Sequence, residues 1–137
     1  MKPSLRPGLS RTSPITIDRD RTISFMGEEA RTYSTPSMIR DIEHTCRDLI
    51  LEHADAGEDS VGMEVAVKHL APTLMGMTVA IDVQVKSMEG RKISFDVAVK
   101  DDLDAIGSGS HTRFVVEKAR TLERIKAKAA RVAGRKQ

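Results

Sequence analysis

The chain has 137 residues, the length of one domain, and with three Phe, one Tyr and no Trp its core must be built from aliphatic side chains. A single cysteine excludes an intrachain disulfide and fits a reducing compartment. The formal net charge of +2 is unevenly spread. Residues 118–137 contain eight Lys and Arg against one Glu, so they carry +7 and the first 117 residues carry −5.

The sequence gives no support to a membrane or metal-binding function. No stretch approaches the roughly 20 apolar residues of a membrane span. No apolar segment follows the basic N-terminus, as it would in a secretory signal. The four histidines and the cysteine lack the spacing of a metal site. We therefore expect a cytoplasmic protein that binds neither a metal nor a membrane.

The first quarter of the chain has little periodicity. Residues 1–13 are rich in Pro, Ser and Arg, which predicts a flexible arm before a domain that begins at residue 14. Alternating apolar residues predict short strands near 15–17 and 22–25. Residues 27–34 are polar and directly precede a predicted helix. They form either a lid over a site or an ordinary surface connection.

A helix is predicted from Pro36 to about His53. Thr35-Pro36 is a helix-start signal, because the threonine hydroxyl caps a free N–H and proline has none to satisfy. The apolar stripe consists of Met38, Ile39, Ile42, Cys46, Leu49 and Ile50. We interpret Cys46 as a packing residue. Glu43 lies at the margin of the stripe, where partial burial suits a carboxylate to acid–base work. The alternative is a boundary glutamate whose tip reaches water.

Four strands are predicted after the helix, at residues 63–70, 78–86, 91–100 and 106–117. Glu89-Gly90 predicts a hairpin turn between the second and the third. His69 lies on the more apolar face of the first strand, which we expect the helix to cover. It is either a site residue or a core-edge histidine bonded to a backbone carbonyl. Gly107 and Gly109 permit close approach of another backbone.

One helix followed by antiparallel strands predicts a single α+β domain over residues 14–125, in which a long curved sheet wraps around a central helix. The edges of such a sheet need protection, and pairing of two subunits would cover one of them. With the helix on the apolar face of the sheet, Thr35, Glu43 and His69 would meet in one cleft.

Several motifs resemble one known family. They are TPSMIRDIE at 35–43, SVG at 60–62, VAVKH at 65–69, SMEGR at 87–91 and IGSGSHTR at 106–113. Together they are similar to the fluoroacetyl-CoA thioesterase family of hotdog-fold proteins. Two features depart from that family. The segment Met26–Ser34 is shorter than the family's phenylalanine-bearing lid and has no phenylalanine, and Pro36 replaces the usual glycine.

The resemblance implies a homodimer of hotdog subunits that hydrolyses a small acyl-CoA thioester, with no cofactor beyond the coenzyme A of the substrate. It implies a catalytic set of Thr35, Glu43 and His69. Glu43 would be nucleophile or general base, and His69 its acid–base partner. It also implies substrate contacts for Gly62 and Arg113; for Arg113 a structural salt bridge is the alternative. The competing function is a non-catalytic hotdog protein that binds acyl-CoA or another small ligand.

The basic C-terminal segment is predicted to be helical from Lys118 to about Ala133, and its end, residues 126–137, lies outside the domain. Its thin apolar stripe consists of Leu122, Ile125, Ala129 and Val132. The stripe favours a solvated helix clamped on the sheet edge. Alternatively, the basic residues attract the phosphates of coenzyme A or bind nucleic acid. The lack of aromatic stacking residues argues against nucleic acid.

Overall fold

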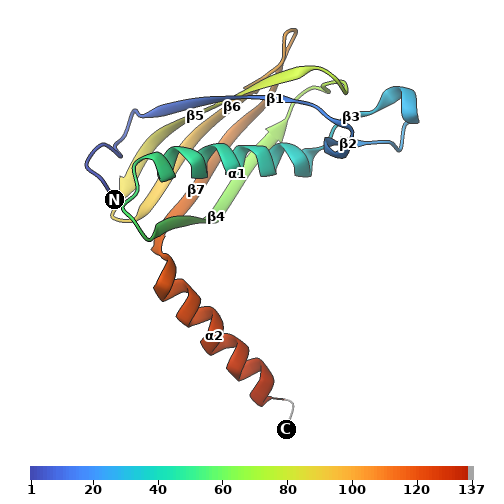
Figure 1. Cartoon of the computed structure of the whole chain (residues 1–137). Coiled ribbons are helices and arrows are strands. Elements are labelled where there is room, and N and C mark those ends of the chain that lie inside the picture. Colours follow the sequence, from blue (N-terminus) through green and yellow to red (C-terminus); the bar gives the residue numbers. More distant parts are fainter. Residues whose placement is uncertain (136–137) are drawn as a thin grey trace.

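The computed structural model describes residues 1–135 and contains one long helix lying along an antiparallel sheet, with a second helix projecting away (Figure 1). The elements are β1 (Ser10–Thr16), η1 (Arg19–Arg21), β2 (Thr22–Ile23), η2 (Glu28–Ala30), β3 (Thr32–Tyr33), α1 (Thr35–Glu52), β4 (Glu58–His69), β5 (Thr78–Glu89), β6 (Lys92–Lys100), β7 (Ala105–Glu117) and α2 (Lys118–Gly134). The main sheet has the order β1-β5-β6-β7-β4. The predicted α+β architecture of a curved sheet around a central helix is confirmed.

The start of α1 lies one residue earlier than predicted. Its N-cap is Ser34, whose hydroxyl accepts a hydrogen bond from the Ser37 N–H at 3.2 Å. Pro36 occupies the first turn, where its missing N–H costs nothing. Because Ser34 does the capping, the hydroxyl of Thr35 is not needed for it. That hydroxyl is available for another partner.

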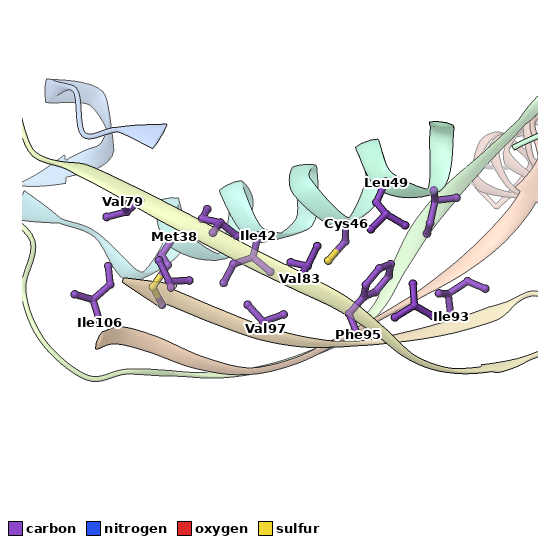
Figure 2. Packing of buried hydrophobic residues seen from close by; sticks show 14 of the residues in the cluster. Met38, Ile42, Cys46, Leu49, Val79, Val83, Ile93, Phe95, Val97 and Ile106 are labelled. Atoms are coloured by element: carbon purple, nitrogen blue, oxygen red, sulfur yellow. The ribbon is translucent and has the colours of Figure 1, made fainter. Parts of the chain in front are cut away.

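The core lies between α1 and the sheet. Figure 2 shows one face of α1 directed at the strands, and the helix residues in this contact are Met38, Ile42, Cys46 and Leu49. They meet the inward side chains of β5, β6 and β7, which are Val79, Val83, Ile93, Phe95, Val97 and Ile106. Burial raises the pKa of the Cys46 thiol to about 12, so it stays protonated at neutral pH. Its predicted packing role is confirmed.

The central strands follow the predicted alternation. Every second side chain is buried in β5 from Val79 to Val85 and in β6 from Ile93 to Val99, and Glu89-Gly90 leads into the turn that joins them, with Gly90 at φ 60°. The predicted close approach in β7 is confirmed at Gly109. A Cβ atom there would collide with the backbone carbonyl of Ala66 in β4.

The edge strand β4 is longer and less regular than predicted. It begins at Glu58, and its register to β7 shifts between Gly62 and Glu64, so Met63 is an extra residue in a bulge. Among residues 1–135, β4 pairs only with β7 in the main sheet. Its apolar side chains at Val61 and Met63 are 43% and 56% exposed. The sheet therefore ends in an apolar, unpaired edge.

The N-terminal segment differs from the expected flexible arm. β1 pairs with β5 along its whole length, from Ser10 to Thr16. Upstream of it, Leu5 is buried in the core. The amino group of Met1 forms ion pairs with Asp55 and Glu58 at 2.7 and 2.6 Å. The folded unit thus begins before residue 14. One face of β1 is exposed and carries polar residues, so its sequence lacks the apolar pattern by which a strand is predicted.

The C-terminal segment is helical and solvated as predicted, since none of the residues of α2 is buried. It is not clamped along the sheet edge, because only its base lies against β7 and β4. Figure 1 shows α2 leaving the end of β7 and extending past β4 into solvent. No helix within residues 1–135 is long and apolar enough to cross a membrane.

Candidate active site

The first residue of α1 and the last residue of β4 meet at one end of the sheet. The Thr35 hydroxyl lies 2.8 Å from Nδ1 of His69. The Tyr33 ring stands edge-on to the His69 ring, with centroids 6.4 Å apart and planes at 78°. The open cleft around this pair is lined by Ile23, Thr32, Tyr33, Thr35, His69, Leu70, Ala71 and Pro72. We call the pair of Thr35 and His69 the first half-site.

His69 has the properties of a proton-transfer group. Burial lowers the pKa of its imidazole below the ordinary value of 6.5, so the ring is neutral at pH 7. Its Nε2 atom is buried and has no hydrogen-bond partner among residues 1–135. If Thr35 donates to Nδ1, then Nε2 carries the proton; if Thr35 accepts from Nδ1–H, then Nε2 is a free base. The Thr35 bond therefore sets which role Nε2 takes.

Glu43 lies at a different place, against the bulge in β4. A Cβ atom built on Gly62 would lie 2.9 Å from Oε1 of Glu43 and 3.6 Å from Nη1 of Arg113. A larger residue at this position would push the Glu43 carboxylate away, so Gly62 lets that carboxylate lie close to the strand backbone. We call the group of Glu43, Gly62 and Arg113 the second half-site.

Arg113 is held rigidly in the second half-site. The guanidinium is buried, and it donates from Nε to the Ser60 hydroxyl at 2.7 Å and from Nη2 to the Ser60 carbonyl at 2.8 Å. Burial lowers the pKa of Arg113, while the nearby Glu43 carboxylate opposes that shift. No ion pair within 4.0 Å involves Arg113 in the described chain, so the alternative of a structural salt bridge has no support there.

His111 supports the second half-site, and the sequence analysis gave it no role. Its Nδ1 lies 2.8 Å from the Glu64 carbonyl, which can only accept, so Nδ1 carries the proton. Nε2 is then an acceptor, and it lies 3.2 Å from the Nη1 donor of Arg113. The ring thus joins the β4 bulge to Arg113. Burial, with the Arg113 charge, lowers the pKa of His111 and keeps it neutral. Its position two residues before Arg113, in the IGSGSHTR motif, was the signal available in the sequence.

The two half-sites of one chain are far apart. Thr35 and Glu43 are eight residues apart on α1, about 12 Å at 1.5 Å per residue. His69 and Gly62 are seven residues apart on β4, about 23 Å at 3.3 Å per residue. We expected Thr35, Glu43 and His69 to meet in one cleft. Within one subunit Thr35 and His69 meet, and Glu43 does not join them. Residue spacing predicted the faces of the elements but not this separation along them.

A buried carboxylate outside the predicted apolar stripe of α1 anchors the segment before the helix. Asp41 accepts from Arg21 Nε at 2.9 Å and from the Tyr33 hydroxyl at 2.6 Å. Burial, then the hydrogen bond to Asp41, raises the pKa of Tyr33. Arg21 and Tyr33 flank the excursion that carries β2, η2 and β3, so Asp41 fixes both of its ends.

That excursion contains the candidate lid of residues 27–34 but begins earlier than we expected. Between β2 and β3 the chain exposes Phe25 and Met26, which are 81% and 75% accessible. Glu28 in η2 pairs with Arg31 and Arg19, which holds the pKa of this carboxyl at about 2. The lid segment as predicted lacks phenylalanine, but Phe25 lies just before it, on the same exposed excursion.

Residues 17–119 match the model of a family described as fluoroacetyl-CoA-specific thioesterase. This range includes both half-sites. The chain belongs to this family. Membership places it among the thioester hydrolases, as the sequence motifs predicted.

Individual relatives agree with the family. A fluoroacetyl-CoA thioesterase of Streptantibioticus cattleyicolor is 30% identical over 135 residues, which cover 93% of this chain and 94% of the relative. A thioesterase-superfamily protein of Thermus thermophilus has a similar structure, with a TM-score of 0.88, 26% identity, and coverage of 98% of this chain and 99% of its own. A variant of a fluoroacetyl-CoA-specific thioesterase, solved with fluoroacetate and CoA, matches with a TM-score of 0.77 and 28% identity, over 85% of this chain and 99% of its own. These likenesses confirm the hotdog fold.

Proposed function

We propose that this protein is an acyl-CoA thioesterase for small acyl groups whose active site is shared between two subunits. In this proposal one subunit supplies the first half-site, Thr35 and His69, and its partner supplies the second, with Glu43, Gly62 and Arg113. The observation that carries the proposal is the Thr35–His69 pair beside an open cleft, because the buried Nε2 of His69 has no hydrogen-bond partner among residues 1–135. Support for the substrate class comes from the relative solved with fluoroacetate and CoA.

The free edge of β4 supports a dimer. The free N–H and C=O groups of an edge strand can hydrogen-bond to a second strand. When the second strand is β4 of another subunit, antiparallel pairing gives a two-fold symmetric dimer. With full overlap of the two 12-residue strands, Glu58 of one faces His69 of the other, and Val65 faces Gly62 of the partner subunit. Val65 is four residues from His69, about 13 Å along the strand. The partner's Glu43 therefore comes nearer to His69 than the Glu43 of the same chain does.

The two-fold symmetry also places the α1-covered faces of both sheets on the same side of the dimer. A two-fold axis perpendicular to the sheet leaves both α1 helices on the same side. His69 and the partner's Glu43 then face a common space under the two helices. This arrangement gathers the set of Thr35, Glu43 and His69 that one chain keeps apart.

Hydrolysis in such a site would proceed as follows. An oxygen nucleophile attacks the acyl carbon, the carbon–sulfur bond breaks, and the thiolate of coenzyme A takes a proton. His69 is suited to hold and deliver that proton through Nε2, since its pKa lies below 6.5 and the Thr35 hydroxyl orients its ring. Arg113 and the backbone N–H at Gly62 would stabilise the negative charge on the carbonyl oxygen. The reaction needs water and no further cofactor.

Two roles are chemically open to Glu43. As nucleophile, its carboxylate attacks the thioester and forms an anhydride that water then cleaves. As general base, it takes the proton from an attacking water. A single turnover in ¹⁸O-water separates them: after an anhydride the product can carry an oxygen from Glu43, whereas after direct attack by water the new product oxygen is ¹⁸O.

Mixing two inactive variants tests whether the site is shared. Glu43→Gln and His69→Ala should each abolish thiol release from acetyl-CoA and fluoroacetyl-CoA. In a shared site, a dimer of one chain of each kind contains one intact set. An equal mixture should then recover about a quarter of wild-type activity, because half the dimers are mixed and each has one working site.

The matched control is a mixture of Thr35→Ala with His69→Ala. Both changes fall in the first half-site, so no arrangement of these chains restores a complete set, and the mixture should stay inactive. If mixed dimers of Glu43→Gln and His69→Ala form and remain inactive, the shared site is wrong. If wild-type protein releases no thiol from any short acyl-CoA, the chain is a binding protein instead of a hydrolase.

A further inference from the structure

The helix α2 presents an apolar stripe that its own domain does not cover. Leu122, Ile125 and Val132 are 51%, 60% and 39% exposed, although their spacing places them on one face. Only the base of this 17-residue helix lies against β7 and β4, and an isolated helix of that length is only marginally stable in water. We therefore expect the stripe to pack against another surface, which would stabilise the helix.

The base of α2 shows where that surface must lie. A groove of about 390 Å³ between α2 and β4 is lined by Asp59, Ser60, Val61, Val116, Lys118, Thr121, Leu122 and Ile125. Ser60 is buried on the α1 side of the sheet, so by alternation Val61 points to the opposite, outer face. The stripe of α2 thus continues the outer face across the free edge of β4. Figure 1 shows α2 running on beyond that edge.

The outer face of the sheet has two carboxylates, Asp82 and Asp96, near the middle of β5 and β6, whereas Lys92 and Lys100 lie at the two ends of β6. A second groove, of about 360 Å³, is lined on β5 and β6 by Asp82, Gln84, Asp96 and Ala98, with Arg11 and its neighbours in β1 on the other side. Asp96 is exposed. The first 117 residues carry −5 and the C-terminal segment +7, so α2 and residues 1–117 of a second copy have opposite net charges.

We propose that α2 lies across the outer face of the sheet of a second copy of this chain. This inference rests on the pairing of β4 edges in the proposed function. The stripe of α2 then packs on β4 and β7 of the second copy, and the basic C-terminal half of the helix reaches its groove at Asp82 and Asp96. The reach suffices, because 17 residues span about 25 Å and strands lie about 4.8 Å apart. In this arrangement α2 of each subunit packs on the outer sheet face of the other subunit, opposite the active sites.

Paired substitutions in the full chain test the stripe. Ile125→Asp should weaken the dimer about tenfold or more, measured by analytical ultracentrifugation across a dilution series, because a buried apolar side chain is replaced by a charge. Ala127→Asp adds the same charge on the opposite face of α2 and should change the dissociation constant by no more than about twofold. Equal effects of the two variants would overturn the proposal.

A second pair of substitutions, one test variant and one control, examines the groove at Asp82 and Asp96. Asp96→Lys should weaken the dimer, and the effect should shrink at high salt because the charges lie at the rim. Asp102→Lys makes the same reversal in the exposed turn between β6 and β7, and it should leave the dimer unchanged. No difference between these variants at low salt would contradict the docking of α2 on this face.

A photo-crosslink locates the helix directly. A benzoylphenylalanine at position 125, in a mixture of ¹⁵N-labelled and unlabelled protein, should join chains of different label, with the attachment in residues 64–70 of β4 or 107–112 of β7 of the second copy. Crosslinks confined to one chain, or made to α1 of the second copy, would overturn the proposal while leaving hydrolysis and β4 pairing intact. A protein that is monomeric by light scattering would overturn both the pairing and this inference, and thiol release would still report separately on hydrolysis.

Discussion

The two half-sites are built in opposite ways. The first, Thr35 and His69, lies at the ends of two elements beside an open cleft. Within the part of the chain that the structure describes, His69 has one side-chain hydrogen bond, and its buried Nε2 has no partner. The second lies inside the sheet, where Arg113 has three hydrogen-bonding contacts, to Ser60 and His111. A group that must exchange protons needs a free atom, whereas a group that stabilises charge needs a fixed position. The contrast predicts that changes in the first half-site affect rate, and that changes in the support of the second affect stability as well.

The largest effect should come from His69. His69→Ala should lower kcat by about 10²–10⁴-fold, the usual contribution of a general acid–base group. Its free energy of unfolding should change by less than about 1 kcal/mol, since the side chain is partly exposed and makes one hydrogen bond. Thiol release and thermal unfolding measure the two quantities. A large loss of stability with unchanged kcat would reverse the contrast between the half-sites.

Asp41 should have the next largest effect, and on stability. Asp41→Asn removes the charge that Arg21 and the Tyr33 hydroxyl contact, so we expect a loss of about 2 kcal/mol. Urea unfolding with fluorescence from Tyr33, the only tyrosine, follows this region directly. Asp48→Asn, on the exposed face of α1, is the control and should be nearly neutral. Equal stability of the two variants would show that Asp41 does not anchor the excursion.

His111 separates two functions of one ring. His111→Asn can keep the N–H donor to the Glu64 carbonyl, whereas His111→Gln can reach Arg113 but not that carbonyl. Each should cost about 1 kcal/mol of stability. If the bulge holds Gly62 in place, both variants should raise KM and lower kcat. Both changes should then be smaller in His111→Asn than in His111→Gln. The opposite order would assign the importance of the ring to its Arg113 contact.

The smallest effect should be the dependence of stability on pH. Burial lowers the pKa of both His69 and His111 below 6.5 in the folded protein. Between those lowered values and 6.5 the unfolded chain binds more protons, so stability should fall as pH drops below about 6.5. Urea unfolding between pH 7.5 and pH 5, repeated on His111→Asn, checks this. The variant should lose less stability on acidification, and an unchanged slope would mean that His111 does not titrate in this range.

The sequence predicted much of the fold and the members of the candidate site. The stripe on α1 and the alternation in β5 and β6 depend only on local periodicity, and the core confirms them. The motif around Arg113 indicated the family, which the match over residues 17–119 confirms. The assignment of Thr35, Glu43 and His69 to one catalytic set stays a prediction until the variants are assayed.

What the sequence alone determined is which face each side chain takes, because a period of 3.6 or 2 needs no knowledge of the neighbours. Tertiary structure decided the distances. In the structure Ser34 is the N-cap of α1, so the Thr35 hydroxyl can form its hydrogen bond with His69. Tertiary structure buried Asp41, because Arg21 and Tyr33 arrive from another segment. It brought Glu43 to Gly62 instead of His69, because α1 runs along β4 and meets the strand at separate points.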